Sequence, residues 1–156
     1  MTDPSDRYRW RIRAARVATP TFRLWQRLTR PMTLGVRGLA RDSAGRVLLI
    51  KHTYRVGWHL PGGGVEVGET TAEAMHREMM EEGAVEPEGA LTLISIRCSR
   101  PHNKRDHVLL YRIESWRPCA PLENGEIAER GFFALDALPA DTTELTRERI
   151  AEALGA

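Results

Sequence analysis

Three glutamates are spaced so that they can lie on one side of a helix. Glu81 and Glu82 follow Glu78 by three and four residues. A helix advances about 100° per residue, so the three side chains share a side. Like charges at this spacing destabilise a bare helix by about a few tenths of a kcal/mol, and a compensating cation is therefore expected. Carboxylate oxygens are hard ligands that suit Mg²⁺ or Mn²⁺ rather than zinc. The alternative is an acidic face that is solvated and supported by basic neighbours.

A glycine-rich segment, residues 62–64, stands shortly before these glutamates. Glycines let the backbone approach the acidic side closely and offer carbonyl or amide groups to an ion or a phosphate. A hard divalent cation held by carboxylates beside such a loop is what phosphate chemistry requires, because the metal offsets phosphate charge and activates water. The two features together indicate a metal-dependent site for phosphorylated compounds.

The same residues carry a family resemblance. Gly63 is followed after five residues by Glu69, and after seven more by Arg77-Glu78-Met79-x-Glu81-Glu82-x-Ala84-Val85. This resembles the Nudix box, G-x5-E-x7-R-E-U-x-E-E-x-G-U, in which U is apolar. The one departure is Ala84, where the family has glycine. Because Gly83 stands one place earlier, we expect a different exit from the helix there.

The resemblance implies metal ligands. It assigns Glu78 and Glu82 as the main ligands of Mg²⁺ or Mn²⁺, Glu81 as a supporting one and the carbonyl of Gly62 as a further one. Arg77 would hold the glutamates in place. Its spacing of four residues from Glu81 independently allows an ion pair.

Two more roles follow from the resemblance. Glu69 would brace the turn into the helix. The general base is Glu78 or a residue on a later loop. On that loop our candidate is Glu126, six residues before Phe132, with Glu129 second. A plain polar surface loop is the alternative for both residues.

Four residues outside the box are candidates for substrate binding. Trp58 and His59 stand just before the glycine loop, although core packing is the alternative for Trp58. Arg100 and Arg105 flank Pro101, which is similar to a proline of the ADP-ribose-type Nudix enzymes. The two arginines would meet phosphates, or would merely be solvated.

The surrounding pattern predicts elements of both kinds. Residues 33–40 and 46–52 read as two strands of a hairpin joined by an Asp-Ser-Ala-Gly turn. A helix is expected from Thr70 to Glu82, capped by Thr70 or Thr71, with an apolar stripe of Ala72, Met75 and Met79. Further strands are expected at 58–60, 65–67, 91–98, 107–113 and 130–135, and a last helix from 141 or 142 to 154. The fold class is therefore α/β or α+β. The resemblance narrows it to a Nudix-type α/β/α sandwich with a mixed β-sheet over residues 31–156.

Composition bounds the rest. A chain of 156 residues with 42% apolar and 28% charged residues has the size and make-up of one globular domain. No apolar run approaches the length of about 18 residues that a membrane span needs. There is no apolar signal-peptide core, and Cys98 and Cys119 are too few for a disulfide scaffold. We therefore expect a cytoplasmic protein.

Charge is unevenly distributed. Residues 1–30 carry eight arginines against two aspartates, so the remainder of a chain of net charge +2 carries −4. This basic N-terminal arm, with a short helix expected after Pro20, would bind nucleic acid or acidic lipid. The reading we favour is a solvated arginine face on a helix that packs against the domain.

The expected activity is Mg²⁺-dependent cleavage of the pyrophosphate bond in a nucleoside diphosphate linked to another moiety, such as ADP-ribose or a nucleotide sugar. A housekeeping pyrophosphohydrolase of nucleoside or deoxynucleoside triphosphates is one alternative, and an RNA-cap or nucleic-acid hydrolase is another. A third is a non-catalytic nucleotide sensor, although such modules usually lose the box carboxylates. A homodimer remains open.

Overall fold

The computed structural model describes residues 32–100, 104–121 and 125–155. The chain divides into the units Met1–Met32 and Thr33–Ala156, and the predicted arm and short helix of residues 1–30 lie outside the described residues. The strands of the second unit are β1 (Thr33–Ala40), β2 (Val47–His52), β3 (Trp58–His59), β4 (Val85–Pro87), β5 (Thr92–Cys98), β6 (Asp106–Ile113), β7 (Trp116–Pro118) and β8 (Ile127–Phe133). Its helices are α2 (Thr71–Glu81) and α3 (Glu144–Leu154). No described helix has the length and apolarity that a membrane crossing requires.

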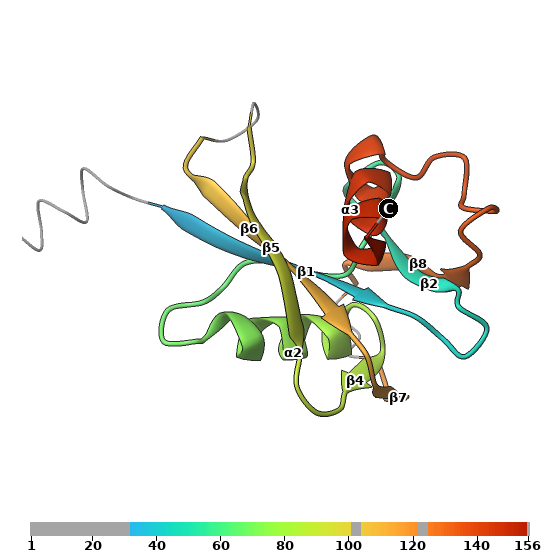
Figure 1. The fold of residues 1–156 in the computed structure, drawn as a ribbon, viewed down its shortest axis with the longest axis horizontal. Helices are drawn as coiled ribbons and strands as arrows, with labels where there is room; N and C mark the ends of the chain where they lie inside the picture. The colour runs from blue at the N-terminus through green and yellow to red at the C-terminus, as the bar shows by residue number, and fades with distance from the viewer. Residues whose placement is uncertain (1–31, 101–103, 122–124, 156) are drawn as a thin grey trace, which may run out of the picture. The chain divides into compact units, whose positions relative to one another are not determined.

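The strands form a mixed sheet, an antiparallel sheet and a short ribbon (Figure 1). In the mixed sheet, of order β1-β6-β5, β1 runs parallel to β6 from the pair Thr33–Asp106 to the pair Ala40–Ile113, and β5 is antiparallel to β6. The second sheet, of order β3-β2-β8, is antiparallel throughout. Among the strands that the structure describes, β4 and β7 pair only with each other.

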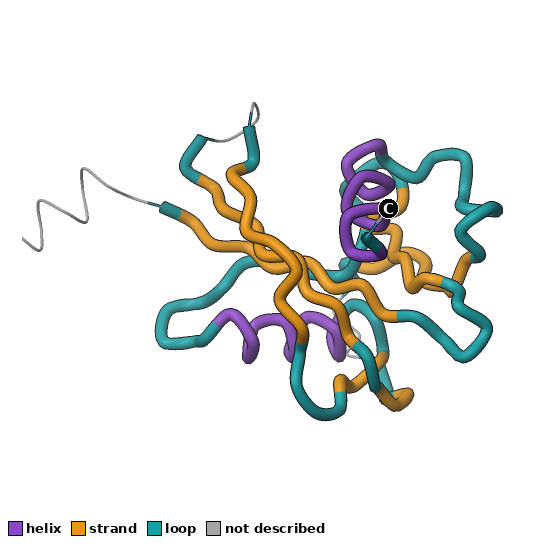
Figure 2. The backbone as a smooth tube through the Cα atoms, viewed as in Figure 1, coloured by secondary structure: helices purple, strands orange, loops and turns teal. Residues whose placement is uncertain are grey.

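The two helices cover opposite faces of the mixed sheet (Figure 2). Alternate residues of β1 point to opposite sides, and Val36 and Ala40 pack with Met75 and Met79 of α2. Leu39 faces the other way, into a core completed by α3 and by the second sheet. The expected α/β/α arrangement around a mixed sheet is therefore confirmed.

A glycine lets α2 lie close to β1. A Cβ added at Gly38 would stand 2.8 Å from both Met75 Cε and Met79 Sδ. These two methionines are fully buried, which confirms two members of the predicted stripe. Ala72, the third member, is exposed, and Ala74 is buried instead. The apolar face is thus turned slightly from the one expected.

Helix α2 begins and ends with distinct local structures. Thr70 caps it in a capping box, accepting from Glu73 N–H while the Glu73 carboxylate accepts from Thr70 N–H at 2.8 Å. At the other end Ala84 adopts φ +54°, the left-handed conformation that favours glycine. Gly83, one place earlier, does not have a positive φ. The chain therefore makes its left-handed turn at an alanine.

The predicted hairpin is also wrong. The turn forms as expected, with Gly45 N–H donating to the Asp42 carbonyl at 2.9 Å. The flanking strands then separate into different sheets, and only one bridge, between Arg41 and Val47, joins them. Strand β1 pairs instead with β6, which lies some seventy residues later in the chain.

Other differences are local. Residues 65–67 form no strand, and within the described ranges a single bridge next to them joins Gly64 to Gly35. Strand β8 starts three residues earlier than predicted. Helix α3 starts at Glu144, after a cap by Thr143. The ribbon of β4 and β7 was not anticipated.

Candidate functional site

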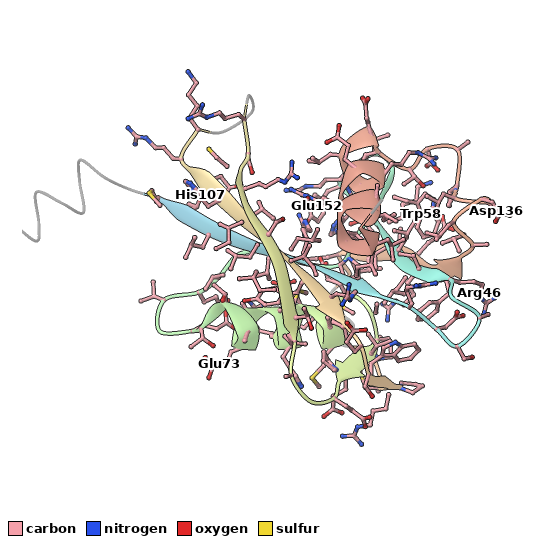
Figure 3. The ribbon with its side chains drawn as sticks, in the orientation of Figure 1. Arg46, Trp58, Glu73, His107, Asp136 and Glu152 are labelled. Carbon is pink, nitrogen blue, oxygen red and sulfur yellow. The ribbon has the colours of Figure 1, made fainter. Side chains whose placement is uncertain are left out.

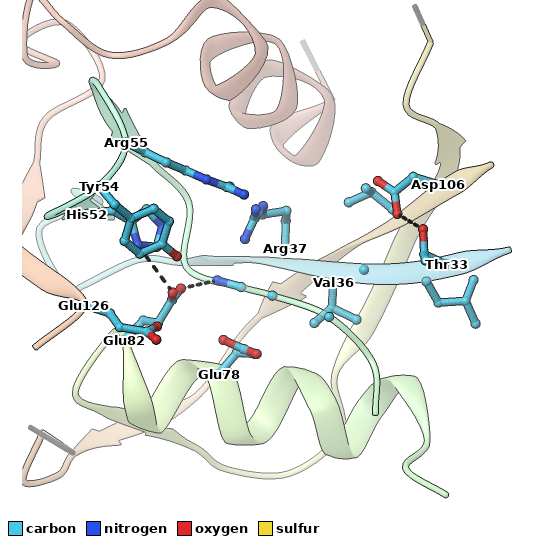
Figure 4. Close-up of a pocket in the computed structure, with 16 residues that line it drawn as sticks. Thr33, Val36, Arg37, His52, Tyr54, Arg55, Glu78, Glu82, Asp106 and Glu126 are labelled. Carbon is cyan, nitrogen blue, oxygen red and sulfur yellow. Dashed lines mark hydrogen bonds and ion pairs between the residues drawn. The ribbon is translucent and has the colours of Figure 1, made fainter. Parts of the chain in front are cut away.

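A cavity of about 410 Å³ opens beside the glycine-rich segment (Figure 4). Its walls come from β1, the end of β2 and the loop after it, the glycine segment, α2, the start of β6 and the residue before β8. Several of the sequence-predicted site residues line it, namely Gly62, Glu78, Glu82 and Glu126. Asp106 also lines the cavity, and its carboxylate accepts a hydrogen bond from the Thr33 hydroxyl at 2.7 Å.

The glycine segment runs along the free edge of β1. Val36 N–H donates to the Gly63 carbonyl and Gly38 N–H donates to the Pro61 carbonyl, both at 2.9 Å. Gly62 adopts φ +142°, and a Cβ there would collide with the Val36 carbonyl. A Cβ at Gly63 would collide with the Glu78 carboxylate. Glycine is required because no side chain fits between strand, loop and helix.

The two main predicted ligands lie side by side in the cavity wall. Glu78 is 7% exposed and Glu82 is 5% exposed. Gly62 N–H donates to Glu82 Oε2 at 2.7 Å. Burial raises the pKa of Glu82 to about 7, and the charge of Glu78 adds to the rise. Burial also raises the pKa of Glu78, although Arg77 opposes this. Two buried acids that disfavour each other's charge are suited to a bound cation.

Arg77 ties the loop to the helix. Its Nε and Nη2 donate to the Glu69 carboxylate at 2.9 and 3.1 Å, and Nη2 also donates to the Gly64 carbonyl at 3.0 Å. Its Nη1 donates to Glu78 Oε1 at 2.7 Å and to Glu81 Oε2 at 3.3 Å. The predicted pair of Arg77 and Glu81 is therefore present. Glu81 faces this guanidinium and does not line the cavity.

His52 and Glu126 complete the wall next to Glu82. Burial lowers the pKa of His52 to about 4, so its ring is neutral at pH 7. Its Nδ1 lies 3.8 Å from Glu82 Oε1 and makes no hydrogen bond to it. The charge of Glu126 contributes to the raised pKa of Glu82. The Glu126 carbonyl accepts a hydrogen bond from Thr53 N–H at 2.8 Å. A residue far along the chain is thus brought to the box glutamates.

The donor set fits a hard divalent cation by its chemistry. Each of Glu78 and Glu82 has one carboxylate oxygen that accepts no hydrogen bond from a described residue. Among the carbonyls of residues 61–64, that of Gly62 likewise accepts none from the described part of the chain, whereas the other three are engaged. Within the described ranges no three acidic, histidine or cysteine side chains already surround a single point. The metal would therefore complete the arrangement of these oxygens.

The four candidate substrate residues lie elsewhere. Trp58 is 7% exposed and packs edge-on against Phe133, in a core cluster that includes Ile150 of α3. Figure 3 labels Trp58 near that helix. His59 bonds through Nε2 to the Val56 carbonyl at 3.0 Å. Arg100 lines a separate cavity of about 900 Å³ between β5, β6 and α3. Arg105 is exposed, and its carbonyl accepts from Thr33 N–H. None of the four side chains lines the cavity beside the glutamates.

Sequence reasoning missed the basic side of the site. Arg37 and Arg55 line the cavity together with Tyr54, and Arg149 of α3 lies near Arg37. The signal for Arg37 was a charged residue inside an otherwise apolar strand. The other two carry no local signal, because they are brought to β1 from a loop and from the last helix.

Comparisons with known proteins agree with this geometry. Residues 31–154 match the family model of the NUDIX domain. A solved structure, the MutT NUDIX hydrolase from Burkholderia pseudomallei, is 26% identical, with a TM-score of 0.65 over 78% of this chain and 98% of that one. An ADP-ribose pyrophosphatase from Streptococcus suis 89-1591 is 24% identical, with a TM-score of 0.56 over 81% of this chain and 94% of that one, which shows the shared fold.

Curated relatives match over a shorter segment. The RNA pyrophosphohydrolase of Shewanella sp. (strain MR-7) is 42% identical over 53 residues, 34% of this chain. The chain spans only 30% of the length of that relative.

Proposed function

Because the chain belongs to the NUDIX family, we propose that it hydrolyses the pyrophosphate bond of a nucleoside diphosphate linked to another group, with Mg²⁺ or Mn²⁺ as cofactor. The observation that carries this proposal is the buried pair of Glu78 and Glu82 beside the glycine segment, in the wall of a cavity. A cytoplasmic location and a homodimer stay predictions.

Glu78, Glu82 and the Gly62 carbonyl would hold the metal, with Glu81 in support. Bound there, the cation would offset phosphate charge and lower the pKa of a bound water. Arg77 would position Glu78 and the glycine segment through the contacts described above. Arg77 also donates a hydrogen bond to Glu81. Glu81 would therefore support the metal through Arg77, or would reach the metal after a change of rotamer.

Glu126 is our candidate for the group that takes the proton from the attacking water. Glu126 lines the cavity. The alternative base is Glu78, but a carboxylate that is bound to metal is a weaker base. Glu126 is also exposed, unlike Glu78 and Glu82. Its position beside Glu82 is what supports this assignment over that of Glu129, which does not line the cavity.

The group linked to the nucleoside diphosphate separates the candidate substrates. If the linked group is a ribose or another sugar, the substrate is ADP-ribose or a nucleotide sugar. If the linked group is a further phosphate, the substrate is a triphosphate. The 53-residue likeness to RNA pyrophosphohydrolases favours testing a 5′-triphosphorylated RNA as well. A steep salt dependence of RNA binding through the arginines of residues 1–30 would support that candidate.

The test is turnover by the full chain with Mg²⁺ on a panel of nucleotide derivatives. We expect Glu82→Gln to lower kcat by about 100-fold or more, because loss of a ligand exceeds the roughly 10–100-fold cost of disturbing a group behind one. Glu88→Gln, a matched change at an exposed site away from the cavity, should retain the full rate.

Two results would contradict the proposal. Near-normal turnover by the Glu82 variant would remove the ligand assignment. Absence of turnover on every compound, in a protein that still binds nucleotides, would instead identify a sensing module.

A further inference from the structure

Two arginines lie on the side of the cavity that faces α3. Arg37 comes from β1 and Arg55 from the loop after β2. The guanidinium groups of Arg37 and Arg55 point toward each other above the glycine segment (Figure 4). Burial lowers the pKa of Arg37 and the charge of Arg55 lowers it further, although the charge of Glu82 opposes this. Arg149 of α3 lines the separate cavity between β5, β6 and α3.

These arginines lack the partners that other arginines of the chain have. Arg77 contacts two carboxylates directly at 2.7 to 2.9 Å. By contrast, no described carboxylate lies within ion-pair distance of Arg37 or Arg55. The Nη1 of Arg37 is shielded from water and has no hydrogen-bond acceptor. An unpaired buried charge is costly, so an anion is expected here.

The cavity therefore has two walls of opposite charge. Glu78, Glu82 and Glu126 form one wall and Arg37 and Arg55 the other, with Asp106 at the end near Thr33. A phosphate chain lying between them would meet the metal of the acidic wall on one side and guanidinium groups on the other. Guanidinium groups recognise phosphate oxygens through paired hydrogen bonds.

The number of arginines bears on the kind of phosphate. A phosphate within a chain carries one negative charge, whereas a terminal phosphate carries about −1.5 to −2 at pH 7. Two guanidinium groups with no described carboxylate within ion-pair distance match the second in charge. We infer that Arg37 and Arg55 bind a terminal phosphate of the substrate. This rests on the proposed function, and it makes the linked group a phosphate rather than a sugar.

The experiment is an isothermal titration of the full chain with ADP and with ADP-ribose, in EDTA. Both ligands contain an adenosine and two phosphates, but only ADP has a terminal phosphate. We expect wild-type protein to bind ADP about tenfold more tightly than ADP-ribose. Arg55→Gln and Arg37→Gln should each weaken ADP binding by roughly tenfold, the range for a hydrogen bond to a charged group. ADP-ribose binding should change by less than about twofold.

Controls separate a local from a general effect of charge. Arg117→Gln removes the same charge from exposed β7, away from the cavity, and should leave both affinities unchanged. Because Arg55 is exposed, its variant tests the inference even if the Arg37 variant fails to fold. Unchanged ADP affinity in folded Arg55→Gln, or equal weakening of both ligands, would overturn the inference.

Turnover with Mg²⁺ distinguishes this inference from the function it rests on. Hydrolysis of ATP or of a 5′-triphosphorylated oligoribonucleotide would support both the hydrolytic function and the phosphate site, if the arginine variants reduce it while any ADP-ribose cleavage persists. Whichever of the two compounds is hydrolysed faster then identifies the source of the phosphate. Rapid ADP-ribose hydrolysis that is unaffected in Arg55→Gln supports the function and overturns the inference. Arginine-dependent ADP binding without any hydrolysis supports the phosphate site and overturns the hydrolytic function.

Discussion

Glu82 occupies an environment that opposes its ionisation. Its carboxylate is buried, accepts one hydrogen bond from Gly62 N–H, and lies near the charges of Glu78 and Glu126. The positive charge of Arg37 favours ionisation of Glu82 but does not outweigh burial, because the pKa of Glu82 is raised to about 7 from a usual 4.5. The site is therefore electrostatically incomplete without a cation.

This shift predicts a pH dependence of stability in the metal-free protein. A raised pKa means that the folded state binds more protons than the unfolded state between about pH 4.5 and 7. The associated stability is fully present below 4.5 and is lost as the pH rises through about 7. Glu82→Gln lacks this loss, so it should exceed wild type in free energy of unfolding at pH 8 by up to about 3 kcal/mol.

Urea denaturation with EDTA at pH 5 and pH 8 measures this difference. The advantage of the Gln variant should shrink at pH 5, where wild-type Glu82 is largely protonated. An advantage that is equal at the two pH values would show that the carboxyl of Glu82 does not titrate in this range.

The acidic half of the site was predictable at the level of residues and the basic half was not. Glu78, Glu82 and Arg77 lie within one helix, where spacing alone fixes which side they share. Arg37 and Arg55 meet only because β1 and the loop after β2 fold onto the same cavity. Spacing along the chain carries no information about such a meeting. Trp58 was a candidate by its position in sequence, but its ring fills the core.

At the scale of elements, the end of α2 is a strained exit. Position 83 requires glycine, because a Cβ there would stand 2.7 Å from the Met79 carbonyl oxygen. The left-handed residue is then Ala84, with φ +54°. A non-glycine residue in this conformation costs about 1 to 2 kcal/mol. Both positions at the end of the helix would therefore accept glycine.

Ala84→Gly should accordingly stabilise the protein by about 1 kcal/mol, because it relieves the steric cost despite a more flexible unfolded chain. Thermal or urea unfolding checks this. Ala90→Gly is the matched control, since Ala90 is an exposed loop residue without a positive φ and should lose up to about 1 kcal/mol. Destabilisation of both variants to the same extent would mean that the exit of α2 stores no strain.

The hairpin predicted for residues 33–40 and 46–52 does not form, because local sequence does not determine which strand pairs with which. The turn at residues 42–45 depends on local bonds such as Ala44 N–H to Asp42 Oδ1 at 3.0 Å, and it was predictable. The partner of a strand depends on which edge the rest of the chain presents. Here β6 takes one edge of β1 and the glycine segment takes the other, so no edge is left for β2.

At the scale of the whole described unit, β1 is the element that connects the acidic wall of the cavity to the basic wall. Its Val36 side faces the core of α2, and its Arg37 side faces the arginines and α3. The mixed sheet and its two covering helices were predictable from the family resemblance. The second sheet, with β2 and β8 antiparallel, places His52 and Glu126 at the cavity, an arrangement that requires the complete fold.

The bonding of β1 on both edges has a consequence for hydrogen–deuterium exchange. The amides of Val36 and Gly38 are bonded to the glycine segment and not to β6, so they become exposed to solvent only when that segment lifts away. Mg²⁺ held by Gly62 and the two glutamates should slow exchange at these two amides, whereas the Cys119 amide, which bonds to Ala84, should exchange at an unchanged rate. Equal exchange at Val36 and Gly38 with and without Mg²⁺ would mean that the cation does not clamp the segment to the strand.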